Sequence, residues 1–378
     1  MLRAMAHRPA TILYLSRGGS IGGSQRQLLN LVAGLDRSRY RPVVVCRSDG
    51  PFVRALRGRE VETYPVILRP WRELRYLLVR YLDSRRLTRL ARRWPPALVH
   101  ANDPWLTQYM ARVAGALGVP SILHVRAPMT CRQVRKHGCG LAGDLVAISR
   151  RIRNDLVGAG LEESRISVIP DSVDLDQFKP SRGSSNVLRR QFPAAQGALI
   201  GIVGRIGPLK RQLEFLQAAR QVLSDRPNAA TFLIIGGDAK PWYDKAIRSF
   251  VAGHDLEKRV AFTGRRDDMP DVLASLDLLV TLSGGSVMLE ALACGTPVVS
   301  AGFTRPEDST IVRDGRTGFV LGPGQESQLP GLLLRLLDQP GILAELSANA
   351  RPHVESQFGH IKLAGATQRL YDRVLGLA

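Results

Sequence analysis

The sequence predicts an α/β protein built from two Rossmann-like domains that face each other across a cleft. Its chain opens with a strand, a glycine-rich loop and a helix, and the same order of elements begins again near residue 199. Between the two series lies a stretch rich in Ser, Gly and Pro, which is typical of an interdomain linker. With 378 residues, the chain is long enough for each half to bury its own core.

These patterns also predict the domain boundaries. We expect an N-terminal domain over residues 1–180, a linker over residues 181–196 and a C-terminal domain over residues 197–360. A last helix, over residues 361–378, is expected to pack back toward the N-terminal domain.

Short apolar runs predict the strands of the N-terminal domain at residues 11–16, 41–46, 61–66, 97–101, 121–125, 144–149 and 166–170. The loop after the first strand contains Gly22 and Gly23 but lacks the G-x-G-x-x-G spacing of a dinucleotide site. We therefore expect these glycines to let a ligand approach the backbone, with a helix following over residues 25–35.

Two histidines stand near the ends of predicted strands. His100 and His124 occupy the position at which open α/β sheets bind ligands, which makes both candidates for the cleft. A single strand histidine is more often structural. Arg126, which comes soon after His124, favours an anion nearby.

Positive charge is concentrated in the N-terminal half. Residues 1–190 contain 33 Lys and Arg against 14 Asp and Glu, a net charge of +19, whereas the rest of the chain contains 20 against 19. An excess confined to one half indicates an anionic partner for that half: a phospholipid surface, a phosphorylated acceptor or nucleic acid. Nucleic acid is the weakest of the three, because no recognised reading motif or aromatic stacking platform accompanies the charge.

Residues 69–94 carry nine arginines among Trp, Tyr and Leu side chains spaced by three and four, which predicts one amphipathic helix. One interpretation is a helix packed on the sheet with a solvated arginine face. The other, which the charge distribution favours, is a helix lying on an anionic membrane surface.

Composition excludes several classes of protein. No apolar run approaches the roughly 18–20 residues that span a bilayer, and the first ten residues are too polar for a secretory signal. The four cysteines show no C-x-x-C spacing, so neither a zinc site nor a disulfide framework is expected. A cytoplasmic protein, peripheral on the inner face of the membrane, fits these features.

In the C-terminal domain, apolar runs predict strands at residues 199–203, 231–236, 260–263, 278–282 and 298–301, with a helix over residues 212–223. Arg205 and Lys210 follow the first of these strands on one loop. A guanidinium fork and a point charge placed together suit a diphosphate.

The chain is organised around residues 276–300, which read as strand, glycine-rich turn, helix over residues 287–294 and strand. The N–H groups of such a turn and the helix dipole favour a phosphate. Glu290, about one turn into the helix, can accept hydrogen bonds from sugar hydroxyls. A plain tight turn followed by a solvated glutamate is the alternative.

In this order and spacing, the motifs resemble those of the family 4 retaining glycosyltransferases of the GT-B fold, over nearly the whole chain. The resemblance is carried by Gly22-Gly23, by Ile169-Pro170-Asp171-Ser172-Val173-Asp174 with Phe178 and Pro180, by Val203-Gly204-Arg205 with Lys210, by Gly264 and Asp277, by residues 290–299 and by residues 314–318.

The resemblance implies an enzyme that moves a sugar from a nucleotide-diphosphate sugar, UDP- or GDP-linked, to a lipid-linked or anionic glycan acceptor. Cell-surface polysaccharide or glycolipid synthesis is the expected setting. The donor would bind mainly to the C-terminal domain and the acceptor to the N-terminal domain. Fixed cations would stabilise the departing nucleotide, and no obligatory metal or other cofactor is expected.

The same resemblance implies the roles of individual residues. Arg205 and Lys210 match the pair that neutralises the diphosphate, Glu290 matches the glutamate that holds the ribose, and His124 matches a histidine near the reacting sugar. These four are the expected catalytic residues. The expected donor-binding residues are Gly22, Gly23, Gly204, Arg205, Lys210, Gly237, Arg265, Ser283, Gly284, Gly285, Ser286, Val287 and Glu290.

Three positions depart from the family pattern. Leu282 stands where the first glutamate of the E-x7-E motif is usual, Asp171 where asparagine is, and Arg211 where glycine is. Leucine cannot accept a hydrogen bond from the donor sugar. The alternative hypothesis is therefore a catalytically silent GT-B module that binds a nucleotide sugar or a partner enzyme.

Overall fold

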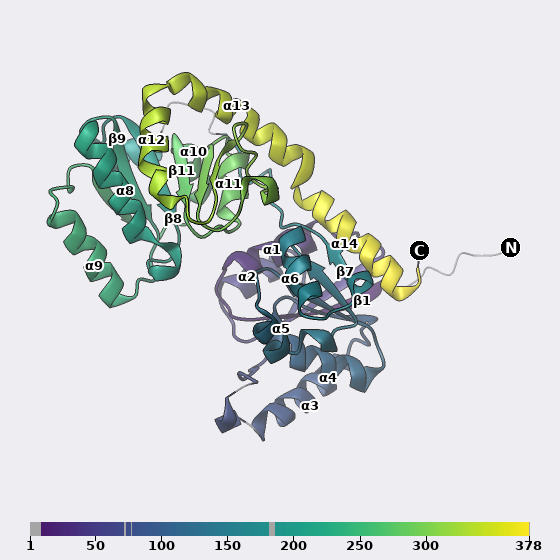
Figure 1. The fold of residues 1–378 in the computed structure, drawn as a ribbon. Helices are drawn as coiled ribbons and strands as arrows, with labels where there is room; N and C mark the ends of the chain where they lie inside the picture. Colours follow the sequence, from purple (N-terminus) through teal and green to yellow (C-terminus); the bar gives the residue numbers. More distant parts are fainter. Residues whose placement is uncertain (1–8, 72, 77, 181–185, 378) are drawn as a thin grey trace. The chain divides into compact units, whose positions relative to one another are not determined.

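The computed structural model describes residues 9–71, 73–76, 78–180 and 186–377. It divides into two compact units: unit 1 comprises residues 1–172 and 360–378, and unit 2 comprises residues 173–359. Both units are α/β (Figure 1).

Within the described residues, the sheet of unit 1 has seven parallel strands in the order β3-β2-β1-β4-β5-β6-β7. The strands are β1 (Ala10–Ser16), β2 (Tyr40–Cys46), β3 (Glu62–Pro65), β4 (Leu98–Ala101), β5 (Ser121–Val125), β6 (Asp144–Ala147) and β7 (Ile166–Val168). The helices are α1 (Gly23–Ala33), α2 (Pro51–Arg57), α3 (Val79–Ala91), α4 (Thr107–Leu117), α5 (Cys131–His137), α6 (Arg150–Gly158) and α14 (His360–Leu375).

The sheet of unit 2 has six parallel strands in the part that the structure describes, in the order β10-β9-β8-β11-β12-β13. They are β8 (Ala198–Val203), β9 (Ala230–Ile235), β10 (Val260–Gly264), β11 (Leu278–Thr281), β12 (Val298–Ala301) and β13 (Gly318–Leu321). The helices are α7 (Val187–Gln191), α8 (Gln212–Asp225), α9 (Pro241–Ala252), α10 (Met269–Ala274), α11 (Val287–Ala293), α12 (Leu329–Asp338) and α13 (Pro340–Gln357).

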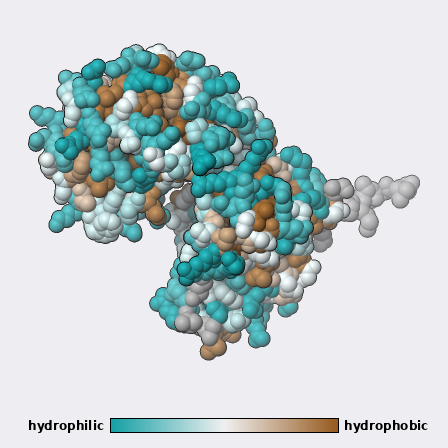
Figure 2. Space-filling model, in the orientation of Figure 1, coloured by the Kyte–Doolittle hydropathy of each residue, from teal (hydrophilic) through white to brown (hydrophobic). Residues whose placement is uncertain are grey.

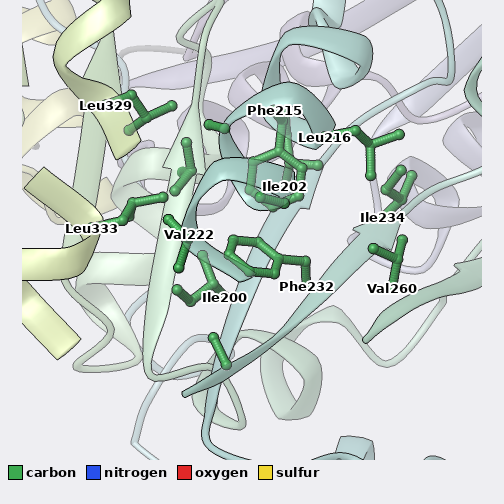
Figure 3. Close-up of a cluster of buried hydrophobic side chains, with 14 of the residues drawn as sticks. Ile200, Ile202, Phe215, Leu216, Val222, Phe232, Ile234, Val260, Leu329 and Leu333 are labelled. Carbon is green, nitrogen blue, oxygen red and sulfur yellow. The ribbon is translucent and has the colours of Figure 1, made fainter. Parts of the chain in front are cut away.

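Alternation along the strands explains why helices cover both faces of the unit 2 sheet. Ile200 packs with Phe215 of α8 and Leu333 of α12, as Figure 3 shows. Its neighbour Leu199 points the other way and packs with residues of α10, α11 and α13. Because successive strand side chains point to opposite faces, a strand that is apolar at every position needs a helical layer on each side.

Unit 1 is built in the same way, and its C-terminal helix forms part of one layer. Leu363, Ala364, Leu370 and Tyr371 of α14 are buried with residues of α1, α2 and the sheet. The opposite layer contains α3, α4, α5 and α6. On the face shown in Figure 2, hydrophilic residues cover much of each unit, with hydrophobic patches among them.

The prediction of one amphipathic helix over residues 69–94 is wrong in its first part. Arg69 and Pro70 form no helix, residues 74–76 form a short 3-10 helix, and α3 begins only at Val79. Trp71 stacks edge-on against Tyr109 of α4, 5.1 Å between ring centroids, and its carbonyl accepts a hydrogen bond from Arg80. Tertiary packing of Trp71 therefore replaces the expected first turns. Arg72 and Leu77 lie outside the described residues.

Two further differences concern unit 2. Residues 181–185 of the expected linker lie outside the described residues, but residues 187–191 form α7, whose Leu188 is fully buried in the unit 2 core. Strand β13 is not predicted by the sequence analysis. Its first residue, Gly318, has φ of +158°, and a Cβ there would lie 1.8 Å from the carbonyl oxygen of Val298.

Candidate active site

The expected donor-binding residues of unit 2 lie at the carboxyl ends of its strands. The loop with Gly204, Arg205 and Lys210 follows β8, and residues 283–286 follow β11. These two strands are neighbours, although two strands, β9 and β10, separate them in sequence order. Strand order reverses between them, which is the position where open α/β sheets bind their ligands.

Lys210 links these two loops. Its Nζ donates a hydrogen bond of 3.4 Å to the carbonyl oxygen of Gly284, and it lies 3.7 Å from the point that a Cβ of Gly285 would occupy. The aliphatic part of the side chain crosses Gly204, where a Cβ would lie 2.9 Å from Cδ and Cε. Position 204 favours glycine, because its φ is +148° and because Lys210 would have to move to make room for a side chain.

Arg205 adds a second cation to the same loop. Its side chain is exposed, and its carbonyl oxygen accepts a hydrogen bond of 3.0 Å from Nε2 of the fully buried Gln212. Burial, and then the charge of Arg205, lower the pKa of Lys210 below its ordinary value. Because the positive charges of Lys210 and Arg205 repel each other, their proximity indicates a site for a negatively charged ligand.

Glu290 lies on α11, the helix that follows the glycine turn. Gly284 and Gly285 have φ of +66° and +117°, values that favour glycine, and the chain then enters the helix. Glu290 is 6% exposed, and its carboxylate accepts a hydrogen bond of 3.3 Å from Oγ of Ser286. Ser283 Oγ is buried without a hydrogen-bond partner. Val287 packs in the core, so only its backbone can contribute to a ligand site.

Gly237 and Arg265 lie at neighbouring strand ends. Gly237 follows β9, and a Cβ there would come within 3.1 Å of Cβ of Arg265, which follows β10. The preceding glycine, Gly236, has φ of +148°, and a Cβ at this position would lie 2.0 Å from the carbonyl oxygen of Gly204. The loops that follow β8, β9 and β10 are therefore in direct contact.

Two residues that contact the glycine turn or the loop of Lys210 were missed by the sequence analysis. Phe303 has ring carbons within 2.9 Å of the point that a Cβ of Gly284 would occupy. Glu326 forms an ion pair of 3.3 Å with Arg211. Phe303 follows β12 by two residues, so its place at a strand end was a usable signal, whereas nothing local marks Glu326.

In unit 1, Gly22 and Gly23 lie at the start of α1 and are exposed. Gly22 N donates a hydrogen bond of 3.2 Å to Oε1 of Gln25, and Nε2 of Gln25 donates one of 2.5 Å to the carbonyl of Arg17. The glycine loop is therefore closed on itself by a single buried glutamine.

His124 is buried at the end of β5, 2% exposed. Arg126 faces both ring nitrogens, with Nη1 2.9 Å from Nε2 and Nη2 3.2 Å from Nδ1. The ring of His100 stacks nearly parallel to the ring of His124, with centroids 5.7 Å apart and an interplanar angle of 10°. Burial lowers the pKa of His124 well below its ordinary value, and Arg126 and His100 lower it further, so this imidazole is neutral.

The sequence analysis predicts an anion near Arg126, and the carboxylate of Asp171 supplies that negative charge. Arg126 forms an ion pair of 2.5 Å with Asp171, and its Nη2 donates a hydrogen bond of 3.0 Å to Oδ1 of Asn102. His100 is also explained structurally, because its Nδ1 lies 2.7 Å from the hydroxyl of Tyr371. Burial lowers the pKa of His100 to about 3.

The structure thus gathers Gly204, Arg205, Lys210, Gly284, Gly285, Ser286 and Glu290 around the reversal point of the unit 2 sheet. It places Gly22, Gly23 and His124 in unit 1. Among the described residues, no group of three or more His, Cys, Asp or Glu side chains is placed to hold a metal ion.

Comparison with known proteins identifies the family of this chain. Residues 21–177 match the family described as Glycosyltransferase Family 4, and residues 197–339 match Glycosyl transferases group 1. The 2-deoxystreptamine glucosyltransferase of Streptomyces kanamyceticus is 31% identical over 318 residues, which cover 76% of this chain and 80% of that protein.

The chain belongs to the group 1, family 4 glycosyltransferases. It transfers a sugar from a nucleotide sugar and is of the hexosyltransferase type. A D-inositol 3-phosphate glycosyltransferase of Acidothermus cellulolyticus is 30% identical over 374 residues, covering 88% of this chain and 76% of that protein.

Solved structures of lower identity confirm the GT-B fold of this glycosyltransferase. The crystal structure of HepE from Anabaena in complex with UDP and glucose superposes with a TM-score of 0.82 at 23% identity. The match covers 96% of this chain and 99% of HepE.

The structure accounts for two departures of this glycosyltransferase from the family pattern. Leu282 is 3% exposed and packs in the core with residues of α8 and α12. Arg211 has φ of +59°, the left-handed conformation that favours glycine, and forms ion pairs with Glu214 at 3.1 Å and Glu326 at 3.3 Å. Two carboxylates therefore hold a backbone that a glycine would adopt without strain.

Proposed function

We propose that this glycosyltransferase retains the anomeric configuration of the donor sugar, and that the donor is a UDP- or GDP-linked sugar bound by unit 2. One observation carries the proposal: Lys210, with Arg205 close to it on the same loop, meets the glycine turn of residues 283–286 at the reversal point of the sheet. The HepE complex supports a uridine nucleotide, because that structure of the same fold contains UDP and glucose.

The chemistry assigned to these residues is stabilisation of the leaving group. The bond between the sugar C1 and the diphosphate oxygen breaks, and a bond between C1 and an acceptor hydroxyl oxygen forms. The hydroxyl proton passes to the departing diphosphate. Negative charge grows on the diphosphate as the bond breaks, and Lys210 and Arg205 are already positioned to offset it. Glu290 holds the ribose, and the neutral His124 contacts the reacting sugar.

The acceptor is proposed to be an anionic or lipid-linked glycan bound by unit 1. The two relatives named above differ here: one acts on an amine-bearing 2-deoxystreptamine and the other on D-inositol 3-phosphate. The net charge of +19 over residues 1–190 would repel an amine and attract a phosphate. Electrostatics therefore favours the second kind of acceptor.

The arginine groove of unit 1 supports a position on the inner, cytoplasmic face of an anionic membrane. We use this name for a groove of about 510 Å³ between α3 and α4, lined by Arg85, Arg89, Arg92 and Arg112 around Ala111, Gly115 and Ala116. Next to it, Leu78 and Leu82 are 79% and 50% exposed, and the Tyr81 ring lies 4.3 Å from the guanidinium of Arg112. Exposed apolar side chains beside arginines suit the headgroup region of anionic lipid. No helix among the described residues is long and apolar enough to cross a bilayer.

The donor proposal is tested by calorimetry with UDP, GDP, ADP and CMP. We expect one nucleoside diphosphate to bind and Lys210→Ala to abolish its binding. A panel of sugars linked to that nucleotide then gives the transfer activity, with product NMR reporting the anomeric configuration. Absence of binding by every nucleotide, in folded protein, would overturn the donor proposal.

The membrane proposal is tested with phosphatidylglycerol vesicles. Replacing the four arginines of the arginine groove by Gln should weaken binding by two to three orders of magnitude, at about 1 kcal/mol for each charge, and leave nucleotide affinity unchanged. The matched control replaces four other exposed arginines of unit 1, namely Arg47, Arg132, Arg135 and Arg150. An equal loss in the control would show that net charge, and not the groove, binds the vesicles.

A further inference from the structure

Arg126 connects four segments of unit 1 at the carboxyl edge of its sheet. Its guanidinium reaches His124 at the end of β5, Asn102 after β4 and Asp171 after β7. Asn102 in turn donates a hydrogen bond of 2.9 Å from Nδ2 to the carbonyl oxygen of Ser24, on the first turn of α1. One buried cation thus connects the expected catalytic histidine to the helix that follows Gly22 and Gly23.

This connection crosses the point where strand order reverses in unit 1. Strands β1 and β4 are neighbours there, and α1 follows β1 while Asn102 follows β4. Asn102 is 2% exposed and uses both ends of its amide, one toward Arg126 and the other toward Ser24. A buried amide with both ends bonded has one orientation, so the start of α1 and the guanidinium are fixed relative to each other.

The contact between Arg126 and His124 restricts the imidazole in a specific way. A neutral imidazole has one acceptor nitrogen, and Arg126 presents N–H groups to both ring nitrogens. An imidazolium has no acceptor and would face a cation, so the contact is compatible only with neutral His124. The stacked ring of His100, held by the hydroxyl of Tyr371, closes the opposite side.

Asp171 supplies the charge that makes this buried arginine possible. Both side chains of the pair are shielded, with 12% of Arg126 and 14% of Asp171 exposed. A guanidinium with this little solvent requires a counter-charge, which the asparagine usual at position 171 in the family would not provide. The departure at position 171 and the arginine at position 126 therefore belong to one feature.

We propose that Arg126 is a positioning residue, which holds the His124 imidazole in one orientation and sets it relative to the start of α1, with Asp171 as its counter-charge. This inference rests on the proposed role of His124 at the reacting sugar. Loss of the guanidinium should lower kcat by about 10- to 100-fold, the scale of a misplaced contact near the reacting atoms. KM for the donor should stay within about twofold, because unit 2 binds the nucleotide.

Two variants separate positioning from stability. Asp171→Asn leaves Arg126 buried without a counter-charge but keeps its hydrogen bonds, so its Tm should fall while kcat, measured where it is folded, stays within about threefold. The double variant Arg126→Met with Asp171→Asn removes both charges, so its Tm should return toward wild type while kcat remains low. A purely structural role predicts the opposite for the double variant: kcat recovers with Tm.

A matched control pair and a spectroscopic signal complete the experiment. Arg373 and Asp144 form an ion pair of 3.0 Å elsewhere in unit 1, and Arg373→Gln with Asp144→Asn should leave kcat unchanged. The Cε1–H resonance of His124, assigned by its absence in His124→Ala, should be single and sharp in the wild type and broadened or doubled in the double variant. An unchanged resonance together with an unchanged kcat would overturn the inference.

The same experiment distinguishes failure of the proposed function. If His124→Ala transfers sugar at the wild-type rate, the role of His124 is refuted, and the resonance still decides whether Arg126 orients the ring. If no nucleotide sugar is transferred by the wild type, the proposed donor chemistry fails independently. If His124→Ala is impaired while the double variant equals wild type, only the positioning inference fails.

Discussion

Replacing Lys210 by Met tests the donor site most directly. Met preserves most of the aliphatic length that crosses Gly204, so the packing of the loop is retained. What is lost is one positive charge, whose Nζ lies 3.4 Å from the carbonyl oxygen of Gly284. The variant therefore removes the charge from the turn and leaves the surrounding fold unchanged.

The magnitude follows from the position of that charge. Two unit charges about 4 Å apart interact by about 4 kcal/mol at the effective dielectric of a site near the protein surface. Removal of one preorganised group that stabilises developing negative charge costs about 10²- to 10³-fold in kcat, or roughly 2.7–4 kcal/mol. Both routes give the same range. We therefore expect Lys210→Met to lower kcat by two to three orders of magnitude.

The pH dependence provides an independent check. Burial and the charge of Arg205 lower the pKa of Lys210, so the wild-type kcat/KM should fall on the alkaline side as pH rises through that lowered value. Lys210→Arg keeps a charge that does not titrate in this range, so its alkaline fall should disappear even if its rate is reduced.

The assay is steady-state release of the nucleoside diphosphate, with Tm measured to confirm folding. A Lys210→Met rate within tenfold of wild type would refute the assignment of Lys210 to the leaving group. So would an alkaline fall that is identical in Lys210→Arg, because another group would then be titrating.

Four further outcomes are expected. Glu290→Gln should weaken nucleoside diphosphate binding about tenfold or more in calorimetry, with an unchanged Tm, because a hydrogen bond to a charged group is lost. Gly236→Ala should destabilise the protein by more than about 2 kcal/mol in urea unfolding, since its Cβ would lie 2.0 Å from a carbonyl oxygen, whereas Gly331→Ala, in open space on α12, should stabilise it by about 0.5–1 kcal/mol. Arg211→Gly should be more stable than Arg211→Ala by about 1 kcal/mol, because φ is +59° at this position. The pKa of His100 is about 3 in the folded protein, so the unfolded chain binds a proton at a higher pH than the folded protein does. The free energy of unfolding should therefore decrease by up to about 1.4 kcal/mol per pH unit as the pH falls below about 6.5. His100→Gln should reduce that slope.

The fold was predictable because its strands are buried on both faces and are read as continuous apolar runs. Strands β5 and β12 have the expected bounds, and several others differ by one or two residues. The failures have tertiary causes. Trp71 packs on α4 and displaces the expected first turns of one long helix. The strand β13 is too short, and begins with a glycine that its own sequence context does not mark as a strand residue.

The candidate site was predictable where its residues follow strands in unit 2. Arg205, Lys210, Gly284 and Gly285 come from two loops that parallel strand ends bring together. Contacts that join distant segments were not predictable. The pair of Arg126 with Asp171 joins residues 45 positions apart, and the pair of Arg211 with Glu326 joins residues 115 apart. No local sequence pattern shows which distant residues form such pairs.

These distant pairs bear on whether the departures from the family pattern indicate a site that has decayed. A site that drifts without selection accumulates single changes that leave buried charges unpaired and strained backbone unsupported. Here the carboxylate at position 171 neutralises a buried arginine, and the left-handed arginine at position 211 is held by Glu326. The departures at positions 171 and 211 thus each have a charged partner elsewhere in the chain. Compensated substitutions beside Lys210 and His124 argue for a site reorganised around its donor and against a catalytically silent module.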